Sequence, residues 1–182
     1  MTSSDDTLLA PGAIRALATE VGASHDGRPQ RAAAGGARLA LVCAKFNGGI
    51  TERLVDGALR AFHDSGLDAT AVEMAWVPGA FELPLAADRF ARSGRVDAVV
   101  ALGAVIRGET AHFDYVAGGC ATGLQRVALH SGVPVVFGVL TTDDVAQALA
   151  RSAQGTGNKG YEAVVTALEM VDLLSLLPKA PA

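Results

Sequence analysis

One short segment joins a histidine to a turn that could bind an anion. Residues 107–112 read Arg-Gly-Glu-Thr-Ala-His and lead into a predicted helix. The first N–H groups of a helix lack partners and the helix dipole favours negative charge there, so this turn predicts a phosphate site. An ordinary helix start capped by Thr110 fits the same residues. His112 falls in the first helical turn, where an imidazole that titrates near neutrality could transfer protons. A hydrogen-bonded structural histidine is the alternative.

Aromatic and polar side chains follow two other predicted strands. Phe46 and Asn47 come after the first strand, and Phe81 and Glu82 come after the second. An aromatic ring at a strand end could stack on a heterocycle, whereas packing in the core is the more common use of phenylalanine. Glu82 could accept hydrogen bonds from a polyol or stabilise the start of a helix. These residues are candidates for a binding site, with structural roles as the alternative.

Known motifs argue against several kinds of chemistry. Residues 155–160, Gly-Thr-Gly-Asn-Lys-Gly, match G-x-G-x-x-G by letter. They follow a helix rather than a strand, and no acidic residue on a second strand comes about 20 positions later, as a dinucleotide site needs. The chain contains no G-x-x-x-x-G-K-S/T, C-x-x-C, H-E-x-x-H or G-x-S-x-G motif. Phosphoryl transfer, metal-dependent hydrolysis and serine esterase chemistry therefore lose support, and the sequence shows no cluster of metal ligands.

The elements that would position these residues alternate between strand and helix. Apolar runs predict strands covered on both faces of a parallel sheet, and segments with helical periodicity separate them. A glycine-punctuated loop is expected over residues 103–110. The predicted strands are Leu39–Lys45, about Thr70–Val77, Asp97–Leu102 and Val133–Leu140. The predicted helices are 50–65, Glu82–Arg92, Ala111–His130 and Tyr161–Leu177. A further short helix is expected to be capped by Thr141–Asp144 and to end at Ser152.

This alternation predicts a three-layer α/β/α, flavodoxin-like domain with an open parallel four-stranded sheet. Ligands bind beyond the carboxyl ends of the strands in such sheets, and the aromatic, glycine-rich and polar segments fall at those ends. The domain is expected over residues 37–178. Residues 1–36 are rich in Ala, Gly, Ser and Pro and predict a mostly disordered tail, and residues 179–182 are expected as a short second tail.

Composition narrows the classes of function. The 182 residues are half apolar and 19% charged, with a formal net charge of −4. A mean hydropathy of +0.31 is high for a solvated monomer and predicts surfaces buried between copies of the chain. Singly scattered basic residues argue against nucleic-acid binding, and the longest apolar runs are too short to span a membrane. Cys43 and Cys120 form no pair motif and, with no secretion pattern at the N-terminus, fit a cytoplasmic protein.

Six blocks of sequence together resemble the lumazine synthase family. In chain order they are Phe46-Asn47, 77–84 (VPGAFELP), 103–110 (GAVIRGET), 112–116 (HFDYV), 137–142 (FGVLTT) and 157–160 (GNKG). The resemblance covers roughly Arg38–Leu177, and Lys45 stands where the family more often has arginine. The family condenses 5-amino-6-ribitylaminouracil with 3,4-dihydroxy-2-butanone 4-phosphate and releases phosphate and water. The resemblance implies this transferase reaction here, with no cofactor and no metal ion.

The resemblance also implies a role for each matched residue. His112 would move protons, and Phe46 would stack on the pyrimidine ring. The family's sites lie between subunits, so Phe137, Arg151 and Lys159 would come from the adjacent chain. The pyrimidine and its ribityl chain would further contact Asn47, Gly79, Ala80, Phe81, Glu82, Val105, Ile106, Phe137 and Lys159, and the phosphate would be bound by backbone at Glu109 and Thr110 and by Arg151.

Assembly follows from the same resemblance. Family members form homopentamers, some of which close into sixty-subunit icosahedral capsids, and riboflavin synthase is a candidate partner. The segment 151–158 carries no insertion and allows either state. Many members add a short N-terminal strand to the neighbour's sheet, which Pro29 disfavours here because proline cannot donate a ladder hydrogen bond.

Two rival functions use the same fold. One is a lumazine- or flavin-binding carrier, and the other is a shell-forming relative with weak catalysis. The presence of His112, Arg151 and the Glu109-Thr110 turn favours the enzyme over the carrier.

Overall fold

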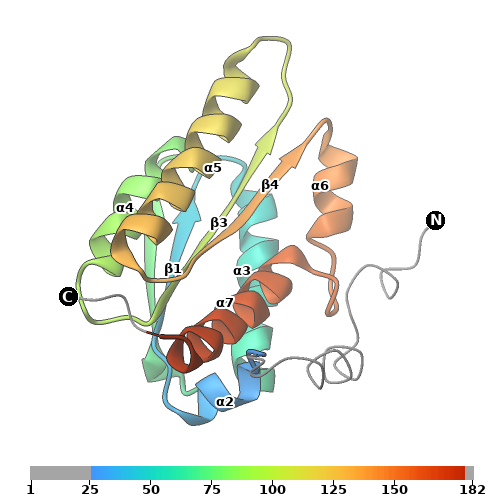
Figure 1. The fold of residues 1–182 in the computed structure, drawn as a ribbon. Helices are drawn as coiled ribbons and strands as arrows, with labels where there is room; N and C mark the ends of the chain where they lie inside the picture. The colour runs from blue at the N-terminus through green and yellow to red at the C-terminus, as the bar shows by residue number, and fades with distance from the viewer. Residues whose placement is uncertain (1–25, 179–182) are drawn as a thin grey trace, which may run out of the picture.

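The computed structural model describes residues 26–178, which fold around one four-stranded sheet (Figure 1). All neighbouring strands pair in parallel, in the order β2-β1-β3-β4. This confirms the predicted open parallel sheet. The strands are β1 (Leu39–Ala44), β2 (Val72–Val77), β3 (Ala98–Ile106) and β4 (Val135–Thr142).

Helices cover both faces of the sheet and complete three layers (Figure 1). The helices α3 (Gly48–Ser65) and α7 (Lys159–Leu176) pack on one face, together with the short α6 (Val145–Arg151). The helices α4 (Leu83–Ala91) and α5 (His112–Ser131) pack on the other face. Two single turns of 3₁₀ helix, η2 (Ala69–Ala71) and η3 (Ala80–Glu82), flank β2. The predicted α/β/α architecture is therefore confirmed, and no helix within residues 26–178 is long and apolar enough to cross a membrane.

Side chains along β1 alternate between two hydrophobic cores. Leu39 packs under α3 and α7, and its neighbour Ala40 packs under α4 and α5. Every residue of β1 is buried, which explains the unbroken apolar run in the sequence. Cys43 and Cys120 are also buried as free thiols, and burial raises the pKa of each to about 12. Both cysteines therefore serve as small apolar side chains.

β3 is longer than the sequence predicted. We expected residues 103–110 to form a loop, but the pairing with β4 continues to Ile106 and Thr142. β4 also extends past its predicted end at Leu140, and so supplies the partner that β3 needs. Gly103 is a packing glycine, because a Cβ there would lie 3.0 Å from the Cβ of Ala44. Glycine in a buried strand was mistaken for a loop signal.

A helix, α2 (Pro29–Ala34), precedes β1 where the sequence predicted a disordered tail. Pro29 stands in the first turn, where its missing N–H costs no helical hydrogen bond. Ala32 and Ala33 are buried. The prediction of disorder was wrong for this segment because a distant helix, α7, holds it in place. The rest of the predicted tail, residues 1–25, and residues 179–182 lie outside the described residues.

One buried carboxylate fixes α2 to α7. Asp172 is 4% exposed and accepts hydrogen bonds from Nε and Nη2 of Arg31, both at 2.6 Å. The backbone N–H of Arg28 adds a third hydrogen bond at 2.7 Å. The Arg31 side chain contributes most to lowering the pKa of Asp172 below its ordinary value. Charge-assisted hydrogen bonds of this kind are stronger than neutral ones.

We predict that Asp172→Asn lowers the free energy of unfolding by about 1–3 kcal/mol at neutral pH. A carboxyl group whose pKa is lower in the folded protein stabilises it above the unfolded pKa, and this stabilisation is lost as the pH falls through the folded value. The difference between wild type and variant should thus shrink below about pH 4. Urea unfolding at equal protein concentration measures it. Asp88→Asn, which removes an exposed ion pair with Arg92, is the control; a loss as large as that of Asp172→Asn would contradict the assignment.

Candidate functional site

A cleft of about 760 Å³ opens at the carboxyl edge of the sheet, on the side of α4 and α5. The ends of β1, β2 and β3 and the first turns of α5 line it. The rule that ligands bind beyond the carboxyl ends of parallel strands selected this edge from sequence alone. The predicted site residues that line the cleft are Phe46, Asn47, Gly79, Ala80, Phe81, Glu82, Val105, Ile106, Thr110 and His112.

The chain leaves β1 along a path that exposes Phe46 on a fixed backbone. The N–H of Phe46 donates to the carbonyl of Pro78 at 3.1 Å. Asn47 then adopts a left-handed backbone with φ of 56°, and its Nδ2 donates to the carbonyl of Ala104 at 2.9 Å. The Phe46 side chain is 72% exposed. An aromatic face on a backbone held from both sides is well placed to stack on a flat ligand.

A second exposed ring comes from the segment between β2 and α4. Phe81 is 61% exposed and lies against α5, where Gly119 leaves room for it. A Cβ at position 119 would lie 2.9 Å from Cε2 of this ring. The neighbouring Glu82 accepts a hydrogen bond from the N–H of Gly79 at 2.9 Å. Glu82 therefore stabilises the local turn, which was one of the two roles predicted from the sequence. It also lines the cleft.

The turn between β3 and α5 keeps several N–H groups free. Within the described residues, the N–H groups of Gly108, Glu109 and Thr110 donate no hydrogen bond. Ala111 occupies the cap position of α5 without a side-chain cap, and Thr110 Oγ1 accepts only a long hydrogen bond of 3.4 Å from His112. Thr110 and Gly108 line the cleft, whereas Glu109 between them does not. The free N–H groups favour the anion-site interpretation over the simple capped helix.

The first turns of α5 contribute more residues to the cleft than His112, the one predicted from the sequence. His112 is exposed and lines the cleft, together with Phe113, Tyr115 and Val116. Tyr115 and Val116 lie three and four positions after His112 and therefore share its helix face, which helical spacing could have revealed. Within residues 26–178, no group of three or more His, Cys, Asp or Glu residues is placed to hold a metal ion. The other lining residues not predicted are Pro78, Ala104 and Gly108.

Phe137, Arg151 and Lys159 lie on a different surface. They line a separate hollow of about 420 Å³ at the outer edge of β4, beside α7. Arg151 Nη1 donates to the carbonyl of Gln147 at 3.2 Å, and Lys159 pairs with Glu162 at 2.6 Å. No residue lines both this hollow and the cleft. A single chain therefore presents the predicted residues as two groups on two surfaces.

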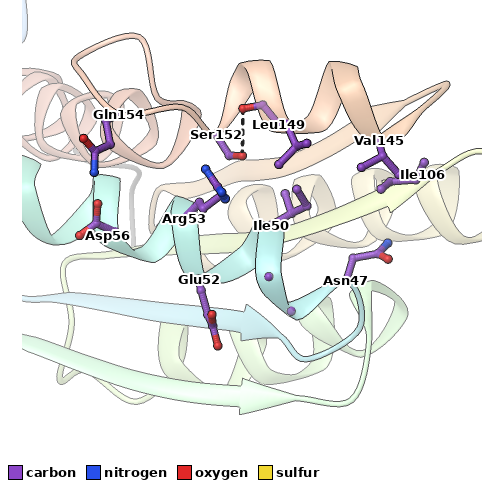
Figure 2. Close-up of a pocket in the computed structure, with 12 residues that line it drawn as sticks. Asn47, Ile50, Glu52, Arg53, Asp56, Ile106, Val145, Leu149, Ser152 and Gln154 are labelled. Atoms are coloured by element: carbon purple, nitrogen blue, oxygen red, sulfur yellow. Dashed lines mark hydrogen bonds between the residues drawn. The ribbon is translucent and has the colours of Figure 1, made fainter.

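In addition to the cleft and the hollow, a groove of about 840 Å³ lies between α3 and α6 (Figure 2). Figure 2 shows Val145 and Leu149 of α6 facing α3, with the side chain of Arg53 between the two helices. Only Asn47 and Ile106 of the predicted residues line this groove, because they lie at the sheet edge where the two faces meet. The groove is the largest of the three hollows, but neither an aromatic side chain nor a histidine lines it. The cleft remains the better candidate site.

Comparison with known families decides what this chain is related to. A sequence model of the 6,7-dimethyl-8-ribityllumazine synthase family matches residues 36–175. That range contains both the cleft and the hollow at β4. The chain belongs to this family. The lumazine synthase family comprises transferases of riboflavin biosynthesis, and membership supports substrate binding and oligomeric assembly in general.

In this member of the lumazine synthase family, a buried asparagine fixes the segment between Arg151 and Lys159. Asn158 is 1% exposed, and its Nδ2 donates to three backbone carbonyls, one on α3 and two in the loop after α6, at 2.9–3.1 Å. Its Oδ1 accepts the N–H of Gly160 at 2.8 Å and so caps α7. One side chain therefore joins three helices. It fixes the end of α6, at Arg151, relative to the start of α7, at Lys159.

We predict that Asn158→Ala lowers the free energy of unfolding by about 3 kcal/mol, because buried carbonyl and N–H groups lose their partner and α7 loses its cap. The control is Asp144→Ala, which removes only the exposed cap of α6 that accepts from Gln147 at 2.7 Å. That loss should be about 1 kcal/mol. Urea unfolding of both variants gives the comparison, and equal losses would show that the buried hydrogen bonds of Asn158 contribute nothing beyond the cap.

Proposed function

We propose that the protein catalyses the 6,7-dimethyl-8-ribityllumazine synthase reaction in the cytoplasm. It would condense 5-amino-6-(D-ribitylamino)uracil with 3,4-dihydroxy-2-butanone 4-phosphate and release phosphate and water, with no cofactor and no metal ion. One observation carries this proposal. Two exposed aromatic rings, a histidine and a turn with free N–H groups meet in a single cleft.

The two parts of the cleft suit two different substrates. A flat pyrimidine can stack on Phe46 and contact Phe81, while Asn47 and Glu82 offer polar atoms to the ribityl hydroxyls. A phosphate can accept hydrogen bonds from the N–H groups at Glu109 and Thr110, at the positive end of the dipole of α5. Binding both substrates side by side converts a bimolecular condensation into a reaction within one complex. Such an arrangement can contribute a large part of a rate enhancement.

The chemistry requires protons to move near neutral pH. The amine of the uracil attacks the ketone and forms an imine with loss of water, phosphate leaves, and ring closure releases a second water. His112 lines the cleft just after the turn formed by Gly108, Glu109 and Thr110, which we call the phosphate turn. An imidazole there can accept a proton in one step and return it in another.

The remaining binding residues would come from a neighbouring subunit. Phe137, Arg151 and Lys159 line the hollow at β4 and do not line the cleft of their own chain. A ring of subunits in which each hollow meets the next cleft would join the two groups. We therefore propose a homopentamer with shared sites, with a sixty-subunit capsid and riboflavin synthase as the candidate larger assembly and partner. The edge position of β4 leaves this surface open for such a contact.

The role of His112 gives the first test of this function. We expect His112→Ala to lower kcat by roughly 10- to 10³-fold, toward the lower side of general acid–base effects, and to change KM for the butanone phosphate little. Formation of the product, followed by its absorbance, measures both constants. His130→Ala, at the exposed end of α5, is the control. An unchanged kcat in His112→Ala would falsify the proton-transfer role, and a wild type that binds the product but never forms it would support the carrier.

The shared site can be tested by mixing damaged subunits. Arg151→Ala should raise KM for the phosphate substrate, because a charged hydrogen bond to a dianion is lost, and His112→Ala should mainly slow turnover. When the two variants are unfolded and refolded together, about a quarter of the interfaces should pair an intact His112 with an intact Arg151, since each side is drawn independently. Activity should then exceed that of both parents.

A second mixture provides the control for this experiment. His112→Ala refolded with Phe46→Ala places both changes in the same cleft, so every site stays damaged and no activity is regained. If the first mixture gives only the average of its parents, the residues act within one chain and the assignment of Arg151 to the neighbour is wrong.

A further inference from the structure

Arg107 joins three segments at the carboxyl edge of the sheet. Its Nε donates to Asp143 Oδ1 and its Nη1 donates to Asp114 Oδ1, each at 3.2 Å. The guanidinium carbon lies 4.1 Å from the centroid of the Phe113 ring, in cation–π contact. Asp114 belongs to the first turn of α5, and Asp143 stands directly before the cap of α6. One side chain therefore links the end of β3 to the starts of two helices.

The backbone of Arg107 is held as firmly as its side chain. Its N–H donates to the carbonyl of Thr142 at 2.8 Å. Arg107 therefore stays bound to β4 one position after Ile106, the last paired residue of β3. The guanidinium thus extends from a point fixed on the sheet. Arginine suits this task because its planar group can donate in two directions while one face stacks on an aromatic ring.

The turn that follows has few contacts of its own. Within the described part of the chain, Gly108 and Glu109 take part in no hydrogen bond, and a Cβ at position 108 would find no atom within 4 Å. At the far end, the N–H of Asp114 donates to the carbonyl of Ala111 at 3.0 Å. Arg107 begins the turn, and its bond to Asp114 reaches the helix where the turn ends. Arg107 therefore has hydrogen bonds at both ends of the turn, through its backbone at the start and its side chain at the end.

We propose that Arg107 is a positioning residue that holds the phosphate turn in its binding shape without contacting the phosphate. The inference rests on the proposed function, which supplies the phosphate substrate. Two carboxylates already accept from the guanidinium and Phe113 covers one face, so Arg107 is engaged as a link rather than free as a ligand. It also compensates two negative charges beside the turn, which would otherwise repel a dianion.

Kinetics of two variants test this role. Arg107→Met should raise KM for the butanone phosphate roughly tenfold, the effect of losing charge-assisted hydrogen bonds, while KM for the ribitylaminouracil and kcat change much less. Arg107→Lys should behave like Arg107→Met, because an ammonium group cannot donate in two directions and stack at once. The control Arg92→Met removes an exposed arginine paired with Asp88 on α4 and should match the wild type.

Three outcomes would overturn the proposal. A KM for the butanone phosphate that is unchanged in Arg107→Lys would indicate that Arg107 binds the phosphate directly, because a lysine could supply the same charge. Equal rises in KM for both substrates, with a lower melting temperature, would make it a general structural residue. No change in Arg107→Met would remove any role.

Binding of inorganic phosphate, measured by calorimetry on the same proteins, separates this inference from the proposed function. A wild type that forms no product contradicts the proposed function alone. Weaker phosphate binding by Arg107→Met and Arg107→Lys than by wild type and Arg92→Met still supports the positioning role, and equal binding by all four proteins contradicts it.

Discussion

The pairing of β3 with β4 connects the two groups of candidate site residues, those of the cleft and those of the hollow at β4. The two strands are in register from Val99 and Val135 to Ile106 and Thr142, so they leave the sheet at the same level. β3 then enters the turn that leads to His112, and β4 enters the helix that ends at Arg151. A hydrogen-bonded ladder is far stiffer than a loop. The separation between the cleft and the hollow at β4 is therefore a property of the sheet, and neither can shift without the other.

Close packing of backbone fixes the second group further. Gly160, at the start of α7, lies directly against the backbone of Leu54, so a Cβ there would overlap its carbonyl oxygen. Gly57 of α3 likewise faces Asn158, leaving no space for a side chain. The glycine-rich segment 155–160 thus contains a point of contact between two helices. Lys159 is carried by a rigid junction, as the proposed contact with a neighbouring subunit would require.

Periodicity was sufficient to predict the layers, and the strand-end rule was sufficient to predict the cleft. Unbroken apolar runs such as β1 have one explanation in a small α/β domain, because only a sheet covered on both faces buries every side chain. The errors arose where local signals have two meanings. Gly103 was interpreted as a loop residue, although it allows β3 to approach Ala44. α2 was assigned to a disordered tail, because its order depends on Asp172, more than 140 positions away.

The site was harder to predict than the fold for a related reason. The types and positions of Phe46, Phe81 and His112 indicated that they are candidates. Only the resemblance to a family suggested that Phe137 and Arg151 act with them. No periodicity within one chain encodes a contact between two copies. Tyr115 and Arg107 were present in the matched blocks, yet their roles appear only once α5 and the ends of β3 and β4 have positions in space.

The distribution of exposed apolar side chains connects binding with assembly. The high mean hydropathy predicts surfaces buried between copies, and large exposed apolar residues lie on both candidate surfaces: Phe46, Phe81 and Tyr115 in the cleft, and Phe137 at β4. Exposed rings favour association, and they equally favour a flat heterocycle. On the proposed function these two needs coincide. A neighbouring subunit that covers the cleft would exclude water from the phosphate turn, and hydrogen bonds from free N–H groups to a dianion strengthen as the local dielectric falls. Assembly would then complete the site electrostatically as well as sterically, and it would cover the exposed rings that line the cleft.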